Sequence, residues 1–101
     1  MERRKYKRAP LDVLIQSHQA IVEGKAEDVS IGGMLVKTEK TFPENEELDV
    51  FFTIPGSSQG IQSRVRVARS EPGSLMGLEF LNLSPESEKA IQQYLAAQSV
   101  P

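Results

Sequence analysis

Six short runs in which apolar and polar residues alternate constrain the fold of this chain more than any other feature. A period of two places successive side chains on opposite faces of a strand, so we expect Leu11, Val13 and Ile15 of the first run to face a core. The six runs cover residues 11–16, 20–27, 34–38, 48–54, 61–69 and 75–81. Gly77, inside the last of them, indicates a bulge or a point of close approach. Short strands with turn residues between them favour a small six-stranded antiparallel β-barrel over a sandwich, and nothing indicates parallel βαβ units.

A helical pattern replaces the strand pattern near the C-terminus. Ser84 is a favourable N-cap residue, Pro85 suits the first helical position, and acidic residues follow in the first turn. Apolar residues then recur at spacings of three and four, at Ala90, Ile91, Tyr94 and Leu95. Because this stripe is narrow, we expect the helix over residues 84–98 to lie on the barrel as a lid or to continue into a partner. The expected fold class is therefore all-β with a C-terminal helix.

The composition limits the chemistry that the chain can perform. With 101 residues we expect one domain, with the barrel over residues 10–83. The absence of cysteine excludes disulfides and thiolate metal sites, and the single histidine, His18, has no carboxylate partner at a suitable spacing. We therefore expect neither an enzyme nor a cofactor. No apolar stretch is long enough to span a bilayer and no signal peptide is visible, so we expect a cytoplasmic protein without membrane insertion.

Charge is distributed unevenly along the chain. Residues 1–8 carry five basic side chains and one acidic one, whereas the remaining residues carry seven basic and thirteen acidic ones. We expect residues 1–9 to form a flexible basic arm, because they have almost no apolar side chains to bury. A localised basic arm on an acidic body favours a small anionic target over a nucleic-acid polymer. Taken by itself, the arm is equally consistent with a solvated tail.

The segment over residues 28–33 reads as a polar turn between two strands. Asp28 and Ser30 are two residues apart and should therefore project from the same face. We expect Gly32 and Gly33 to give the backbone access to positive φ and to let a ligand approach without a Cβ in the way. Asp, Ser and Gly are also the ordinary residues of structural β-turns. Together with the basic arm, however, the turn has the chemistry of an anion site.

These features resemble the PilZ domain, the bacterial receptor module for cyclic di-GMP. Arg4 and Arg8 match the R-x-x-x-R motif of that family, and Asp28, Ser30 and Gly33 match its [D/N]-x-S-x-x-G motif. The closing residues 76–85 are similar to the last strand and the helix start of the family, so the resemblance covers nearly all of residues 1–101. It implies a receptor or adaptor that is switched by cyclic di-GMP.

The resemblance also implies roles for individual residues. Arg4 and Arg8 would contact phosphates and guanine edges, Asp28 and Ser30 would hold a guanine on the barrel surface, and Gly33 would shape the turn. The chemistry is consistent, because a guanidinium fork can meet guanine O6 and N7 while a carboxylate accepts from N1–H and N2–H₂. Arg3 precedes the first motif arginine, a position at which the family sets ligand number, and implies two ligand molecules per chain.

Two further functional classes compete with this interpretation. A PilZ-like adaptor that binds proteins and no nucleotide predicts a damaged motif or a large exposed apolar patch, and no motif position is missing here. A barrel that binds single-stranded nucleic acid would need aromatic side chains gathered on a strand face, and Tyr6 together with Phe51 or Phe52 does not provide them. No residue identifies a downstream protein partner.

Overall fold

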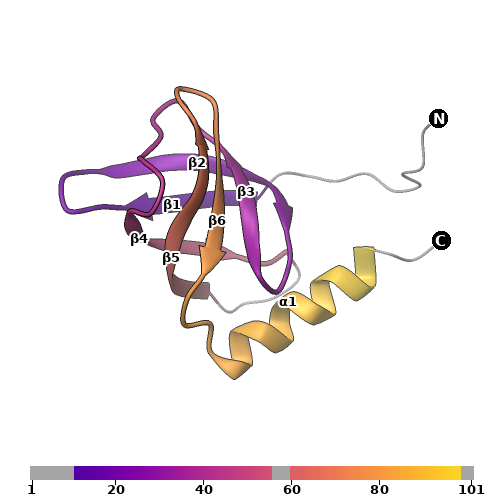
Figure 1. Ribbon diagram of the computed structural model, residues 1–101. Coiled ribbons are helices and arrows are strands. Elements are labelled where there is room, and N and C mark those ends of the chain that lie inside the picture. The colour runs from indigo at the N-terminus through magenta and orange to yellow at the C-terminus, as the bar shows by residue number, and fades with distance from the viewer. Residues whose placement is uncertain (1–10, 56–59, 99–101) are drawn as a thin grey trace, which may run out of the picture.

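Six antiparallel strands close into a barrel in the order β1-β2-β3-β6-β5-β4, and one helix follows them (Figure 1). The computed structural model describes residues 11–55 and 60–98. The elements are β1 (Leu11–Gln16), β2 (Ile21–Val29), β3 (Gly33–Lys37), β4 (Glu47–Thr53), β5 (Gly60–Glu71), β6 (Leu75–Phe80) and α1 (Pro85–Gln98). The expected fold class, an antiparallel barrel of six strands with a C-terminal helix, is therefore confirmed.

The core consists of the inward-facing residues of every strand. Leu11, Val13 and Ile15 of β1 are buried and alternate with exposed neighbours, as the sequence predicts. Phe52 and Phe80 stack with their ring centroids 6.3 Å apart and join β4 to β6 inside the barrel. Burial of this alternating apolar set is the main stabilising contribution to a barrel of this size.

Helix α1 begins where its capping residues predict and covers part of the core. The Ser84 hydroxyl accepts a hydrogen bond from the Ser87 backbone N–H at 3.1 Å, which satisfies one of the free donors of the first turn. Ile91 is completely buried, and Ala90, Tyr94 and Leu95 pack against the core from the same stripe. The helix is therefore a lid on the barrel, and Figure 1 shows it crossing one end of the strands.

Two strands are longer than the sequence pattern predicts. β2 continues through Asp28 to Val29, which pair with Leu35 and Met34 of β3, so the expected six-residue turn is reduced to residues 30–32. β5 continues to Glu71, two residues beyond the predicted run over residues 61–69. A shorter turn suffices there because Gly73 adopts a φ of 71°, a left-handed conformation that reverses the chain tightly.

Each of these long strands contains a register shift. One lies between Ala26 and Asp28 in β2, where β2 pairs with β3, and the other lies between Val67 and Arg69 in β5, where β5 pairs with β6. A β-bulge inserts one extra residue and reverses the facing of every residue after it. Gly77 itself pairs regularly with Arg69, so the bulge that we expected near Gly77 lies on the neighbouring strand.

Candidate functional site

The end of β2 presents the two polar residues of the second motif on the outside of the barrel. Asp28 and Ser30 are exposed and flank Val29, which is buried, so their expected position on one face is confirmed. The bulge before Asp28 produces this facing. Because Ala26 is buried, strict alternation would point residue 28 into the core, and the extra residue turns it outward instead.

Ser30 holds the turn between β2 and β3 together. Its backbone N–H donates to the Gly33 carbonyl at 2.8 Å. Its hydroxyl lies 3.3 Å both from that carbonyl and from the Gly33 N–H, so it can donate to the first or accept from the second. A serine hydroxyl that bonds the backbone of its own turn fixes the position of the neighbouring groups. Ser30 therefore has a structural function whether or not a ligand is bound.

The two glycines of the turn differ from expectation. Neither Gly32 nor Gly33 has a positive φ; among the glycines in the described part of the chain only Gly73 does. A Cβ on Gly33 would lie 2.0 Å from the Leu78 carbonyl oxygen of β6, whereas a Cβ on Gly32 would meet nothing within 4 Å. The missing side chain of Gly33 therefore accommodates the backbone of the neighbouring strand β6. The prediction of positive φ at Gly32 and Gly33 is wrong, whereas the approach of a ligand to these glycines stays a prediction.

The motif residues line a small depression in the barrel surface. Its lining comprises Asp28, Val29, Ser30, Gly33, Met34 and Leu35, and its volume is about 170 Å³. Pockets that enclose a drug-sized ligand usually measure roughly 300–1,000 Å³. The described residues alone can therefore seat one part of a nucleotide against the barrel but cannot enclose it.

The arginines of the first motif lie outside the described residues. Arg3, Arg4 and Arg8 belong to residues 1–10, as does the arm that we expected to be flexible. The structure thus brings together Asp28, Ser30 and Gly33 of the six candidate residues. The chain enters the barrel at Leu11, which pairs with Ala26 directly before the bulge. The attachment point of the arm is therefore beside the motif residues of β2.

A second, larger hollow was not predicted from the sequence. It lies on the outer face of β1, β2 and β4 and has a volume of about 880 Å³. Leu14, Ile21 and Phe51 contribute to its lining and are 43%, 67% and 44% exposed. Leu14 and Phe51 are direct cross-strand partners. The signal in the sequence was the adjacent pair of phenylalanines in β4, because only one of two successive strand residues can face the core.

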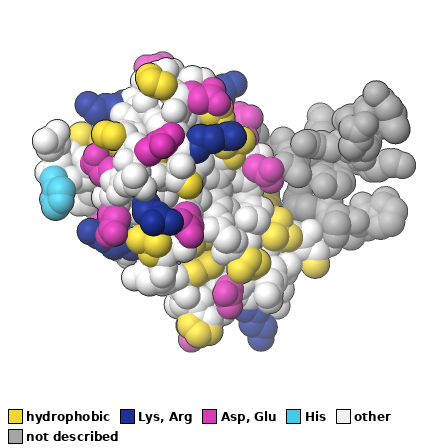
Figure 2. Space-filling model, in the orientation of Figure 1, with side chains coloured by type: hydrophobic (Ala, Val, Ile, Leu, Met, Phe, Trp, Pro, Cys, Tyr) yellow, Lys and Arg dark blue, Asp and Glu magenta, His cyan; other side chains and the backbone are white. Residues whose placement is uncertain are grey.

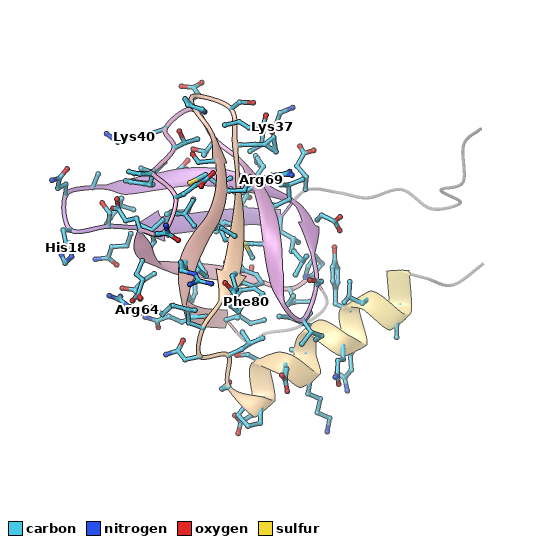
Figure 3. All side chains as sticks on the ribbon, in the orientation of Figure 1. His18, Lys37, Lys40, Arg64, Arg69 and Phe80 are labelled. Atoms are coloured by element: carbon cyan, nitrogen blue, oxygen red, sulfur yellow. The ribbon has the colours of Figure 1, made fainter. Side chains whose placement is uncertain are left out.

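The outward arginines in the first half of β5 are engaged in ion pairs. Arg64, which is labelled in Figure 3, contacts Glu47 at 3.2 Å and Asp49 at 3.1 Å. Arg66 pairs with Glu79. The hydrogen bonds that the Arg64 guanidinium donates to Asp49 and, with a smaller effect, to Glu47 raise the pKa of Arg64 above its usual value. Figure 2 shows acidic and basic side chains interspersed over this view of the barrel. Arg64 and Arg66 face outward, and neither is available to an anionic ligand without losing a carboxylate partner.

The described residues contain no group of three or more His, Cys, Asp or Glu side chains that could hold a metal ion. Within the same ranges, no helix has both the length and the hydrophobicity that crossing a bilayer requires.

Three solved structures share this fold. The first is the inhibitor of motility MotI/DgrA of Bacillus subtilis, with a TM-score of 0.76 and 24% identity over 97% of this chain and 52% of that one. The PilZ domain of YcgR from Escherichia coli, solved with c-di-GMP, has a TM-score of 0.71 and 19% identity over 96% of this chain and 92% of that one. The PilZ domain of CeSA from a cellulose-synthesizing bacterium has a TM-score of 0.66 and 18% identity over 91% of this chain and 95% of that one. This chain thus spans about half of MotI/DgrA and nearly all of the two isolated domains.

Comparison with sequence families agrees with the structural likeness. None of the curated proteins compared with the chain matches it. The PilZ domain profile, in contrast, matches residues 2–97, a range that includes nearly all of the basic arm, all six strands and nearly all of the helix. The chain therefore belongs to the PilZ domain family.

Proposed function

We propose that this protein is a receptor for cyclic di-GMP, which it binds on the outer face of the barrel at the β2–β3 turn. The observation that carries the proposal is the placement of Asp28 and Ser30 at one exposed depression. Membership of the PilZ family and the likeness to the YcgR domain solved with c-di-GMP support the choice of ligand. We assign the whole of residues 1–101 to one receptor domain without enzymatic activity.

The barrel contributes the part of the site that reads a base. Asp28 is an exposed carboxylate, and a carboxylate accepts hydrogen bonds from the N1–H and N2–H₂ groups of guanine. Ser30 is fixed by its bonds to the Gly33 backbone, so its hydroxyl offers a polar contact at a defined position. Asp28 belongs to the β2–β3 ladder and Ser30 to the hydrogen-bonded turn, so the backbone at both residues is already ordered. The conformational entropy that the protein loses on binding is therefore small at these residues.

The basic arm contributes the part of the site that neutralises phosphate. In this proposal Arg4 and Arg8 contact the phosphates and guanine edges of the ligand, where a bidentate guanidinium contact contributes about 1–3 kcal/mol. The depression of about 170 Å³ is too small to enclose a cyclic dinucleotide, so a second element has to cover it. The arm suits this role because it enters the barrel at Leu11, beside β2.

The charge of the arm also supports a second ligand molecule. We propose that Arg3 adds a guanidinium for an additional guanine and phosphate, so that two stacked molecules of cyclic di-GMP occupy each chain. Guanidinium groups stack on purine faces, which lysine does poorly. This stoichiometry rests on the first proposal, which stands even if only one ligand molecule binds.

Calorimetric titration tests the proposed function. We expect saturable heat with cyclic di-GMP and little heat with GTP or a linear dinucleotide. Asp28→Ala should weaken binding by about tenfold or more, because charge-assisted hydrogen bonds are worth roughly 1.5–3 kcal/mol. Glu44→Ala, which removes an exposed acid from the loop before β4, is the charge-matched control and should bind as the wild type does.

A protein-binding adaptor is the second candidate, because the exposed Leu14, Ile21 and Phe51 line the hollow of about 880 Å³. Absence of heat with cyclic di-GMP up to millimolar concentration, from a folded protein, would make this adaptor the better account.

A further inference from the structure

One row of outward-facing residues runs from the motif aspartate on β2 to an arginine on β5, three strands away on the same outer face. Asp28 of β2 pairs with Leu35 of β3, Leu35 pairs with Gly77 of β6, and Gly77 pairs with Arg69 of β5. Neighbouring strands lie about 4.8 Å apart, so the row spans about 14 Å along the sheet. Asp28 and Arg69 are its two ends.

Both ends of the row face outward because of bulges. Asp28 follows the register shift in β2 and Arg69 follows the register shift in β5. Val67 is buried, so without the extra residue at position 68 strict alternation would turn residue 69 toward the core. Bulges often occur beside functional sites, where they redirect a side chain. Here two bulges direct an acid and a base to the same strip of surface.

The floor of this strip is low and largely apolar. Leu35 is partly buried, and Gly77 has no side chain. A Cβ on Gly77 would lie 3.7 Å from the Arg69 Cβ, which is ordinary van der Waals contact, so the backbone does not require glycine there. The absent side chain leaves free surface between Leu35 and Arg69 on which a planar base can lie.

Arg69 also differs from the other two outward arginines of β5 in its ion pairing. Arg64 and Arg66 are held by carboxylates, whereas within the described part of the chain Arg69 takes part in no ion pair. Glu71, two residues further along the same face, is its nearest acidic neighbour on β5. Figure 3 shows Arg69 on the same side of the barrel as Lys37, the exposed basic residue that ends β3. Lys37 and Arg69 therefore supply positive charge beside the carboxylates of Glu71 and Asp28, and the Arg69 guanidinium can donate to acceptor atoms of a ligand.

We propose that Arg69 is a further ligand-binding residue and that the ligand lies across Leu35 and Gly77 between Asp28 and Arg69. This inference rests on the proposed function. In it Asp28 holds one guanine, and the Arg69 guanidinium donates to O6 and N7 of a second guanine, the bidentate contact that arginine makes with this base. The arm attaches on the β1 side of Asp28, so Arg69 would hold the ligand from the opposite side.

Two variants test the inference by calorimetry with cyclic di-GMP. Arg69→Ala should weaken binding by about ten- to a hundredfold, and Arg69→Lys should remain weakened, since an ammonium keeps the charge but loses the fork. Gly77→Val should weaken binding as well, because it fills the floor of the strip while a β-branched residue remains compatible with the strand. Lys89→Ala, which removes one exposed positive charge from α1, is the charge-matched control. Thermal melting should confirm that every variant is folded.

The outcomes separate the two proposals. If wild-type protein binds and Arg69→Ala binds equally well, the role of Arg69 is wrong while the proposed function stands. If Arg69→Lys recovers the wild-type affinity, the contact is one of charge alone and the bidentate reading of guanine is wrong. If the wild-type protein gives no heat at all, the proposed function fails and the assignment of Arg69 fails with it.

Discussion

Replacement of Gly33 by alanine should destabilise the barrel, although the same change at the adjacent Gly32 should not. A Cβ at position 33 would lie 2.0 Å from the Leu78 carbonyl oxygen, and real Cβ atoms essentially never approach such an atom within 3.0 Å. Strands β3 and β6 would therefore have to separate by about 1 Å at this point. The Phe80 N–H donates to the Gly32 carbonyl at 2.9 Å, and a displacement of this size would break that bond.

The loss of stability in Gly33→Ala follows from the overpacking at position 33 and from the weakened hydrogen bonding between β3 and β6. Overpacking typically costs about 1–3 kcal/mol, and a domain of this size loses about 4–8 °C of melting temperature per kcal/mol. We therefore expect Gly33→Ala to melt roughly 5–20 °C below the wild type. Gly32→Ala should change the free energy of unfolding by less than about 1 kcal/mol, because its Cβ meets nothing within 4 Å and its φ is not positive.

Thermal unfolding followed by circular dichroism compares the two variants directly. Equal melting temperatures for Gly33→Ala and Gly32→Ala would refute the close approach of β6 as the reason for glycine at position 33. A stable Gly33→Ala protein that has lost cyclic di-GMP binding would instead return Gly33 to a direct role in the site.

Three further predictions concern the arm and the lid. Arg4→Ala and Arg8→Ala should each weaken cyclic di-GMP binding by roughly ten- to a hundredfold in calorimetry, with the melting temperature of the free protein nearly unchanged; a variant that unfolds the barrel would assign the arm a structural role. Arg3→Ala should lower the ligand ratio from two toward one, and a wild-type ratio near one would contradict the stacked pair. Ile91→Ala should lower the free energy of unfolding by about 2–5 kcal/mol in a denaturant titration, because Ile91 is fully buried on the side of α1 that packs against the core. Replacement of the exposed Gln92 by alanine should change it little.

The strand positions and the core could be predicted because they depend on local alternation. A period of two in β1 is sufficient to bury Leu11, Val13 and Ile15, and the N-cap at Ser84 is sufficient to begin α1. These features depend on residues that are adjacent or nearly adjacent in the sequence.

The remaining features depend on strands that are distant in the sequence. The bulge before Asp28 reads in the sequence as the start of a turn, because an extra polar residue in a strand cannot be distinguished locally from a turn residue. Glycine is required at position 33 because the backbone of Leu78 lies against it, and Leu78 is 45 positions further along the chain. Arg69 looks like any outward arginine until the register places it opposite Gly77.

Backbone amide chemical-shift mapping during a titration with cyclic di-GMP tests the central claim most directly, because it locates the ligand on the barrel. We expect the largest changes at Asp28, Ser30, Gly33 and Leu35, which line the depression at the β2–β3 turn. The absence of changes, or changes confined to residues of the hollow on β1, β2 and β4 such as Leu14 and Phe51, would contradict the proposed site.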